Sequence, residues 1–125
     1  VMGRFYALDR DKNWDRVHLA YDAMVRGVGQ TAKSASEAVK NAYKRNETDE
    51  FILPTIIETE ENVKIKTGDS VISYNFRADR ERQLAYVFDP ANTLDYTDKT
   101  LRTHFVCMME YDENLKNCYI AYPKE

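Results

Sequence analysis

The spacing of apolar residues predicts two helices in the first part of the chain. Over residues 13–26, apolar side chains recur three and four positions apart, as on the buried face of a helix, and Gly27 follows directly. A second helix is expected over residues 34–46, because Ser34 and Glu37 match the capping-box pattern, in which each side chain bonds a backbone N–H at the helix start.

The rest of the chain combines apolar, strand-like segments with one further helix. Residues 71–76 are the best candidate for a central buried strand, and residues 81–88 are the expected third helix. Pro54 has no N–H to give to a central sheet strand, so the apolar segment around it should be an interrupted strand, an edge strand or an extended loop. The further segments expected to be strands are residues 51–57, 63–66, 105–109 and 118–122. Helices and strands alternate along the chain, which predicts an α/β fold with a mixed sheet and flanking helices.

Composition narrows the function classes. The chain has 125 residues, which suits one domain or a piece of one, and no apolar run approaches the ~20 residues that span a bilayer. A net charge of −3 argues against broad binding to nucleic acid or to an anionic membrane.

Cys107 and Cys118 lie in apolar segments, so we expect core thiols of a cytoplasmic protein rather than a disulfide. His18 and His104 have no ligand-like neighbours, so no metal site is expected. Val1 is not a start methionine, and the chain is expected to be cut from something longer.

The segment Asn75-Phe76-Arg77-Ala78-Asp79-Arg80 is the clearest candidate for a binding site. It joins the expected strand to the third helix, so Arg77 and Arg80 would lie at a helix N-terminus, where unpaired N–H groups and the macrodipole are already positive. Turns of this kind in α/β sheets commonly hold anionic ligands. The alternative is a solvated cluster in which Asp79 and Glu81 pair with the arginines.

A second basic segment precedes the first helix, over residues 3–11. Gly3 permits a close backbone approach, and the planar guanidinium groups of Arg4 and Arg10 can bond both oxygens of a carboxylate or phosphate. The aspartates on either side of Arg10 can pair with it, either to orient it or as plain surface ion pairs. No catalytic triad, Gly-rich phosphate loop or paired-carboxylate site is recognisable, so the residues support binding of a small anion without a complete catalytic centre.

Taken in order, several segments resemble the cofactor-independent (2,3-bisphosphoglycerate-independent) phosphoglycerate mutases. The resemblance runs from Gly3 to about Pro123 and rests on Gly3 to Asp11, Trp14-Asp15-Arg16-Val17, Ala20-Tyr21-Asp22-Ala23, Asp49 to Thr55, and Asn75 to Arg80. It implies that residues 1–125 are a fragment, the later part of the substrate-binding (transferase) domain inserted in that enzyme. Met2 stands where a glycine is common in the family.

The resemblance also implies a function. The family interconverts 3-phosphoglycerate and 2-phosphoglycerate through a phosphoserine intermediate, with a serine nucleophile and two manganese ions that would lie outside this chain. Arg4, Arg10, Arg77 and Arg80 match its substrate-binding arginines, and no catalytic or metal-binding residue is expected here. The intact family enzyme is usually a monomer, whereas a fragment should be inactive and could self-associate. The alternative is a stand-alone, non-catalytic anion-binding or interaction domain of the same fold.

Overall fold

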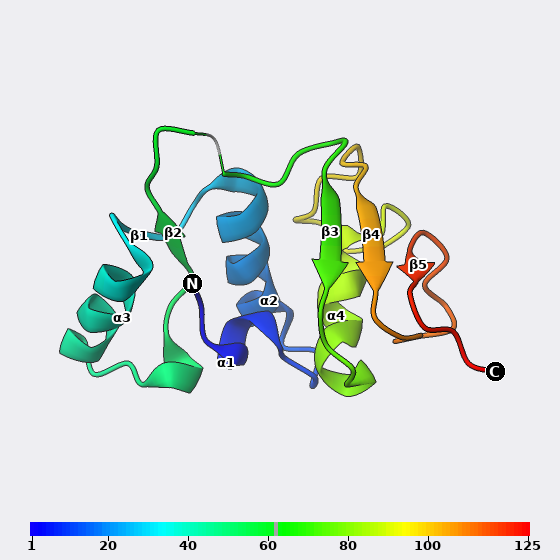
Figure 1. The fold of residues 1–125 in the computed structure, drawn as a ribbon, viewed down its shortest axis with the longest axis horizontal. Helices are drawn as coiled ribbons and strands as arrows, with labels where there is room; N and C mark the ends of the chain where they lie inside the picture. Colours follow the sequence, from blue (N-terminus) through cyan, green and yellow to red (C-terminus); the bar gives the residue numbers. More distant parts are fainter. Residues whose placement is uncertain (62) are drawn as a thin grey trace. The chain divides into compact units, whose positions relative to one another are not determined.

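The computed structural model describes residues 1–61 and 63–125. They divide into two compact units, of which unit 1 comprises residues 1–9 and 13–65, and unit 2 comprises residues 10–12 and 66–125 (Figure 1). Both units contain helices and strands, which confirms the α/β class. The strand pairings described are all parallel, in two small sheets, where the sequence favoured one mixed sheet. The reason is that a helix or a long loop joins each pair of neighbouring strands, and parallel pairs need such crossovers.

Unit 1 is built around the two helices that the apolar spacing predicts. Its elements are α1 (Arg4–Ala7), α2 (Trp14–Tyr21), the π-helical turn η1 (Asp22–Arg26), β1 (Gln30–Ala32), α3 (Ala35–Lys44), the 3-10 turn η2 (Asp49–Phe51) and β2 (Thr55–Ile57). The helix predicted over residues 13–26 is formed by α2 and η1 together. It is followed by Gly27 as its C-cap, with a left-handed φ of 67°. At the start of α3, Ser34 Oγ accepts a bond from the Glu37 N–H at 3.1 Å, as predicted. The Glu37 carboxylate accepts from the N–H of Lys33, one residue before the expected donor.

The strand predicted around Pro54 is interrupted, as expected. Residues 49–51 form η2, and β2 begins only at Thr55, directly after the proline. The Pro54 carbonyl nevertheless accepts from the Gln30 N–H at 3.0 Å, next to the parallel pair of β1 and β2. The strand predicted over residues 63–66 is absent from that described part of the chain, where the Ile65 N–H bonds the Met24 carbonyl instead of a ladder partner.

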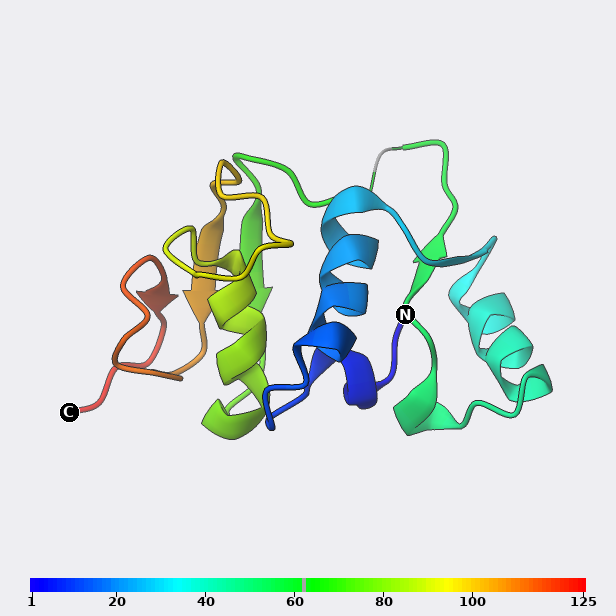
Figure 2. The same cartoon turned by 180° about the vertical axis from the view of Figure 1, so that it is seen from behind.

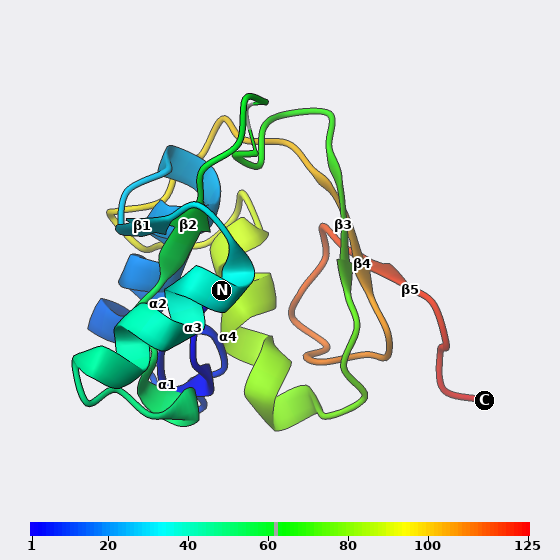
Figure 3. The same cartoon turned by 60° about the vertical axis from the view of Figure 1, so that its left-hand side comes forward.

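Unit 2 is a three-stranded parallel sheet with one helix against it. Its elements are β3 (Ser70–Ser73), α4 (Ala78–Phe88), β4 (His104–Cys107) and β5 (Tyr119–Ile120), in the sheet order β3-β4-β5. Figures 2 and 3 show α4 lying on one face of the β3–β4 pair. Phe88 of α4 stacks on Phe105 of β4 with ring centroids 5.4 Å apart, and both rings are buried.

The two cysteines were expected to be buried thiols, which is confirmed for Cys107 and only in part for Cys118. Cys107 is fully buried in β4, Cys118 is half-buried, and both are free. Burial raises the pKa of the Cys107 thiol to about 12, with a smaller contribution from Cys118 beside it. Within the described residues, no helix is both long and apolar enough to cross a bilayer.

The prediction of a central buried strand over residues 71–76 is wrong. β3 lies at the edge of its sheet, ends at Ser73, and β4 takes the central place. Because α4 covers only one face, the alternating side chains of β3 divide, with Ser73 buried and Ile72 66% exposed. Tyr74 and Phe76 beyond the strand are 87% and 83% exposed. An apolar run indicates extended structure, but its ladder partners decide whether it is central.

Residue 3 must be a glycine because there is no room for a side chain, and not because its backbone conformation requires one. Its φ of −76° suits any residue, but a Cβ there would lie 2.0 Å from the Glu50 carbonyl oxygen. The close approach lets the Gly3 N–H donate to the Ile52 carbonyl at 2.8 Å, tying residues 1–3 to the chain before β2.

We expect Gly3→Ala to destabilise unit 1 by about 3 kcal/mol or more, because the added methyl group meets backbone that cannot rotate away. Urea unfolding followed by circular dichroism measures the change. Gly68→Ala is the matched control, since Gly68 has a φ of 96° but nothing within 4 Å of the added Cβ. Gly68→Ala should lower the free energy of unfolding by less, about 1–2 kcal/mol, through backbone strain alone. Equal costs for the two variants would contradict the steric explanation.

The exposed edge of unit 2 predicts self-association. β3 is an edge strand, and Ile72, Tyr74 and Phe76 are largely exposed on it and just after it. Open edges and apolar surface tend to pair with a second copy. Sedimentation velocity should show a mean mass that rises with protein concentration, and Ile72→Lys should weaken this rise by placing a charge on the edge. A constant monomer mass at every concentration would refute the expectation.

Candidate anion-binding site

The structure confirms that the basic segment is a strand-to-helix turn. β3 ends at Ser73 and α4 begins at Ala78, three residues earlier than the sequence indicates, with Arg77 in the N-cap position. The first turn of α4 has unpaired N–H groups and the positive end of the helix dipole. Arg77 and Arg80 add positive charge there, and the acidic residues of the first turn are Asp79 and Glu81.

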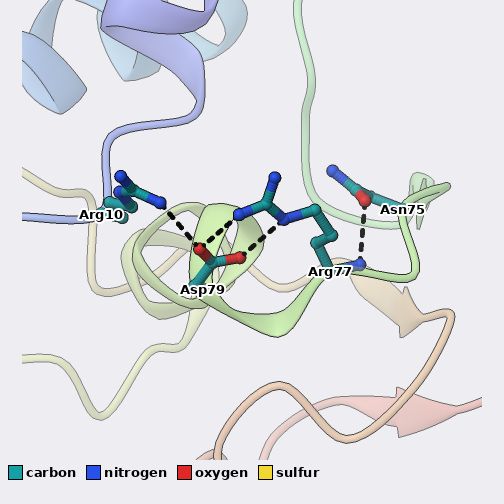
Figure 4. Close-up of polar contacts among 4 residues, drawn as sticks. All are labelled: Arg10, Asn75, Arg77 and Asp79. Carbon is teal, nitrogen blue, oxygen red and sulfur yellow. Dashed lines mark hydrogen bonds and ion pairs between the residues drawn. The ribbon is translucent and has the colours of Figure 1, made fainter.

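Two arginines that are distant in sequence converge on one carboxylate in unit 2 (Figure 4). Arg77 donates to both oxygens of Asp79, from Nε at 3.1 Å and from Nη2 at 2.8 Å. Arg10 donates to the same carboxylate from Nη1 at 3.3 Å, across 69 positions of sequence. The three side chains are between 39% and 55% exposed, so an anion in solution can reach them. The ion pairs of the alternative, a solvated cluster of charges, are present at Asp79, where two arginines share one carboxylate.

The two guanidinium groups keep Asp79 ionised. They lower its pKa from 3.8 to about 2, Arg77 acting mainly through its hydrogen bond and Arg10 contributing less. The carboxylate of Asp79 thus remains a permanent acceptor for both arginines at any pH where a phosphate or carboxylate ligand would be charged.

The other two candidate arginines are placed differently. Arg80 is half-buried in the first turn of α4, three residues after Arg77. Arg4 belongs to unit 1, where its Nη2 lies 3.1 Å from Glu50 Oε2 in an exposed ion pair. The structure thus brings Arg10 and Arg77 together in unit 2, and it pairs Arg4 with a carboxylate of its own unit.

Asp9 has a different role from the one that its place beside Arg10 suggested. Its carboxylate accepts from the backbone N–H of Asn13 at 2.9 Å and from Asn13 Nδ2 at 2.7 Å, and it lies 3.6 Å from Arg16. Asp9 is therefore bonded to the start of α2, and Arg10 bonds Asp79. The guanidinium of Arg16 also lies 3.8 Å from the ring centre of Phe5, a cation–π contact.

A polar cluster behind the turn was missed by reasoning from the sequence. Glu81 is buried, and its two oxygens accept from Ser73 Oγ at 2.6 Å and from Asn75 Nδ2 at 3.2 Å. The hydroxyl of Tyr111 lies 2.9 Å and 2.5 Å from the carbonyl oxygens of Ser73 and Asn75. In the sequence, Glu81 is one more acidic residue of a helix start, and nothing marks Tyr111 as its neighbour.

Within residues 1–61 and 63–125, no three His, Cys, Asp or Glu side chains are grouped as ligands of a metal ion would be. The two manganese ions that the resemblance implies would lie outside this chain.

The depressed pKa of Asp79 predicts a pH dependence. Between about 2 and 3.8 the unfolded chain binds more protons than the folded chain, so the stability that Asp79 contributes is complete above 3.8 and is lost as the pH falls through about 2. A carbon-detected NMR titration of the Asp79 carboxyl should give a midpoint near 2. Arg77→Ala should raise that midpoint toward 3.8, and more than Arg10→Ala does, because Arg77 makes the larger contribution. A midpoint of 3.8 in the unsubstituted chain would show that the pairs do not form in solution.

The chain is similar to known proteins over nearly all of its length. It is 50% identical to the 2,3-bisphosphoglycerate-independent phosphoglycerate mutase of Clostridium kluyveri over 127 aligned residues, which cover 100% of this chain and 25% of that protein. It is 44% identical to the mutase of the same description from Clostridioides difficile, with 98% of this chain and 24% of that protein covered. The chain thus spans about a quarter of the length of these relatives.

A solved structure supports the same relation. Leishmania mexicana phosphoglycerate mutase, crystallised at low cobalt concentration, matches 98% of this chain and 24% of its own chain with a TM-score of 0.82 and 28% identity. Residues 1–113 match the family model described as the BPG-independent PGAM N-terminus. The chain therefore belongs to the family of 2,3-bisphosphoglycerate-independent phosphoglycerate mutases.

Proposed function

We propose that this chain is part of the transferase domain of a glycolytic, cytoplasmic mutase that interconverts 3-phosphoglycerate and 2-phosphoglycerate, and that its arginines hold the substrate. The observation that carries the proposal is the convergence of Arg10 and Arg77 on the Asp79 carboxylate at the N-terminus of α4. Family membership supports the reaction, and the geometry supports the role of the arginines.

The contact with Asp79 is itself evidence of what this site can bind. A carboxylate there accepts two bonds from the Arg77 fork and one from Arg10, which is how arginines commonly recognise carboxylate and phosphate groups. Each guanidinium has five N–H donors, so these bonds do not use up the capacity of either arginine. A phosphoglycerate has both a carboxylate and a phosphate, and Arg80 is placed to add charge at the same helix start.

In the intact enzyme these residues would bind and orient the substrate. They would hold the glycerate while the phosphoryl group moves to a serine outside this chain and returns to the other hydroxyl. Their positive charge would stabilise the negative charge on the phosphoryl oxygens during transfer. For Arg4, which belongs to unit 1, substrate binding is proposed from the family motif alone. We expect the chain alone to be inactive, because the family resemblance places the serine nucleophile outside it.

The binding role is tested with the double variant Arg77→Ala, Arg80→Ala and 3-phosphoglycerate. Titration of the labelled chain should shift the amide NMR signals of residues 75–81, and the double variant should weaken the apparent affinity by roughly tenfold or more, since it removes the charge-assisted bonds of both arginines. Arg102→Ala is the matched control, because Arg102 is an exposed arginine of unit 2 outside the motif, bonded to the Lys99 carbonyl. Identical shift changes in the double variant and the unsubstituted chain would show that the site is assigned to the wrong residues.

A further inference from the structure

We propose that Asn75, which is hydrogen-bonded to Glu81 and Tyr111, is a positioning residue that fixes Arg77 in the ligand-free protein. The inference rests on the proposed function, since it concerns how the binding arginine is held. It assigns a task to three residues that make no contact with a ligand in this proposal and act through Arg77.

The buried carboxylate of Glu81 is the group to which the Asn75 side chain is anchored. The Glu81 side chain leaves the first turn of α4 toward the sheet and is only 6% exposed. A buried carboxylate is costly unless its oxygens are bonded, and here Ser73 Oγ bonds one oxygen and Asn75 Nδ2 bonds the other. Releasing Asn75 would leave one buried oxygen without that bond, so the position of the Asn75 side chain is strongly determined.

Asn75 in turn is hydrogen-bonded to the backbone of Arg77. Its Oδ1 accepts from the Arg77 backbone N–H at 2.9 Å (Figure 4). Its Nδ2 donates to Glu81 Oε1 at 3.2 Å. Of the two ends of the Asn75 amide, only the NH2 can donate to a carboxylate and only the carbonyl oxygen can accept from an N–H, so the two bonds together fix the orientation of the amide. One side chain thus connects the buried carboxylate to the N-cap residue of α4.

Tyr111 holds the main chain of the same residue. It is 2% exposed, and its hydroxyl lies 2.5 Å from the Asn75 carbonyl oxygen and accepts from the Met108 N–H at 3.3 Å. The loop between β4 and β5 therefore fixes the turn that follows β3. Asn75 is held at its amide nitrogen, its amide oxygen and its carbonyl.

Apolar packing does not hold this turn. Tyr74 and Phe76, on either side of Asn75, are 87% and 83% exposed and gain little from burial. The order of the turn therefore depends on the polar bonds to Asn75. If they were absent, a ligand would have to order the turn as it bound, and affinity would fall by that cost.

Three substitutions separate positioning from general stability. Asn75→Ala removes the connection between Glu81 and Arg77. Ser73→Ala removes one bond to the same buried carboxylate but leaves Asn75 in place. Glu81→Gln keeps the Asn75 bond through its amide oxygen, and its NH2 can donate to Ser73 Oγ, since a hydroxyl also accepts.

The test uses the labelled chain, first alone and then with 3-phosphoglycerate. Asn75→Ala should speed hydrogen exchange of the Arg77 amide about tenfold, lower the heteronuclear NOE of the Arg77 Nε–H, and weaken 3-phosphoglycerate binding about tenfold. Ser73→Ala and Glu81→Gln should leave the two Arg77 signals close to those of the unsubstituted chain, even where they lower the thermal midpoint. Circular dichroism establishes that each variant is folded.

Unchanged exchange and mobility of Arg77 in folded Asn75→Ala would overturn the inference. If Asn75→Ala does not fold, Tyr111→Phe decides. It keeps the ring and removes the hydroxyl that contacts the carbonyls of Ser73 and Asn75 and the N–H of Met108. Unchanged Arg77 signals in this variant would also overturn the inference. The ligand-free measurements stand apart from the proposed function. Loosened Arg77 signals in a chain that does not bind 3-phosphoglycerate would support the positioning role and reject the substrate role.

Discussion

Positive charge at the start of α4 is the constraint on which the candidate site of unit 2 depends. The unpaired N–H groups of a helix start already attract anions, and this chain adds arginines in and beside the first turn. Such an arrangement needs negative charge to offset it. Asp79 provides this at the surface, where it also draws in Arg10, and the buried Glu81 accepts the bonds that order the turn. The two acidic residues of one helical turn therefore have different roles, one exposed among cations and one buried among neutral donors.

Membership in the mutase family gives this electrostatic arrangement a biological context. The relatives are about four times as long as this chain, and under the proposed function the arginines of unit 2 would meet the carboxylate and the phosphate of the substrate. The site is open to solvent and contains no nucleophile among its assigned residues. That combination suits a substrate-holding element better than a reaction centre.

Several features could be predicted because they depend on neighbours in sequence. The helix from Trp14 and the capping of α3 by Ser34 follow from residues three and four positions apart. The interruption at Pro54 follows from a missing N–H. The strand-to-helix turn before α4 was located from the order of an apolar run and a helix-like run, to within three residues of its helical start. The central position assigned to residues 71–76 failed because a run of apolar residues carries no information about which strands lie beside it.

By itself, the sequence determined the main helices, the α/β class and the ordered motifs that identify the family. Only the tertiary structure decided that all the described strand pairs are parallel, that β3 is an edge strand, and that Arg10 meets Asp79. It also decided that Glu81 is buried against Ser73 and Asn75. The physical reason is the range of the interactions. Helix starts and turns are set by bonds within a few residues, whereas sheet order and the Arg10–Asp79 pair arise only when segments distant in sequence are brought together by folding.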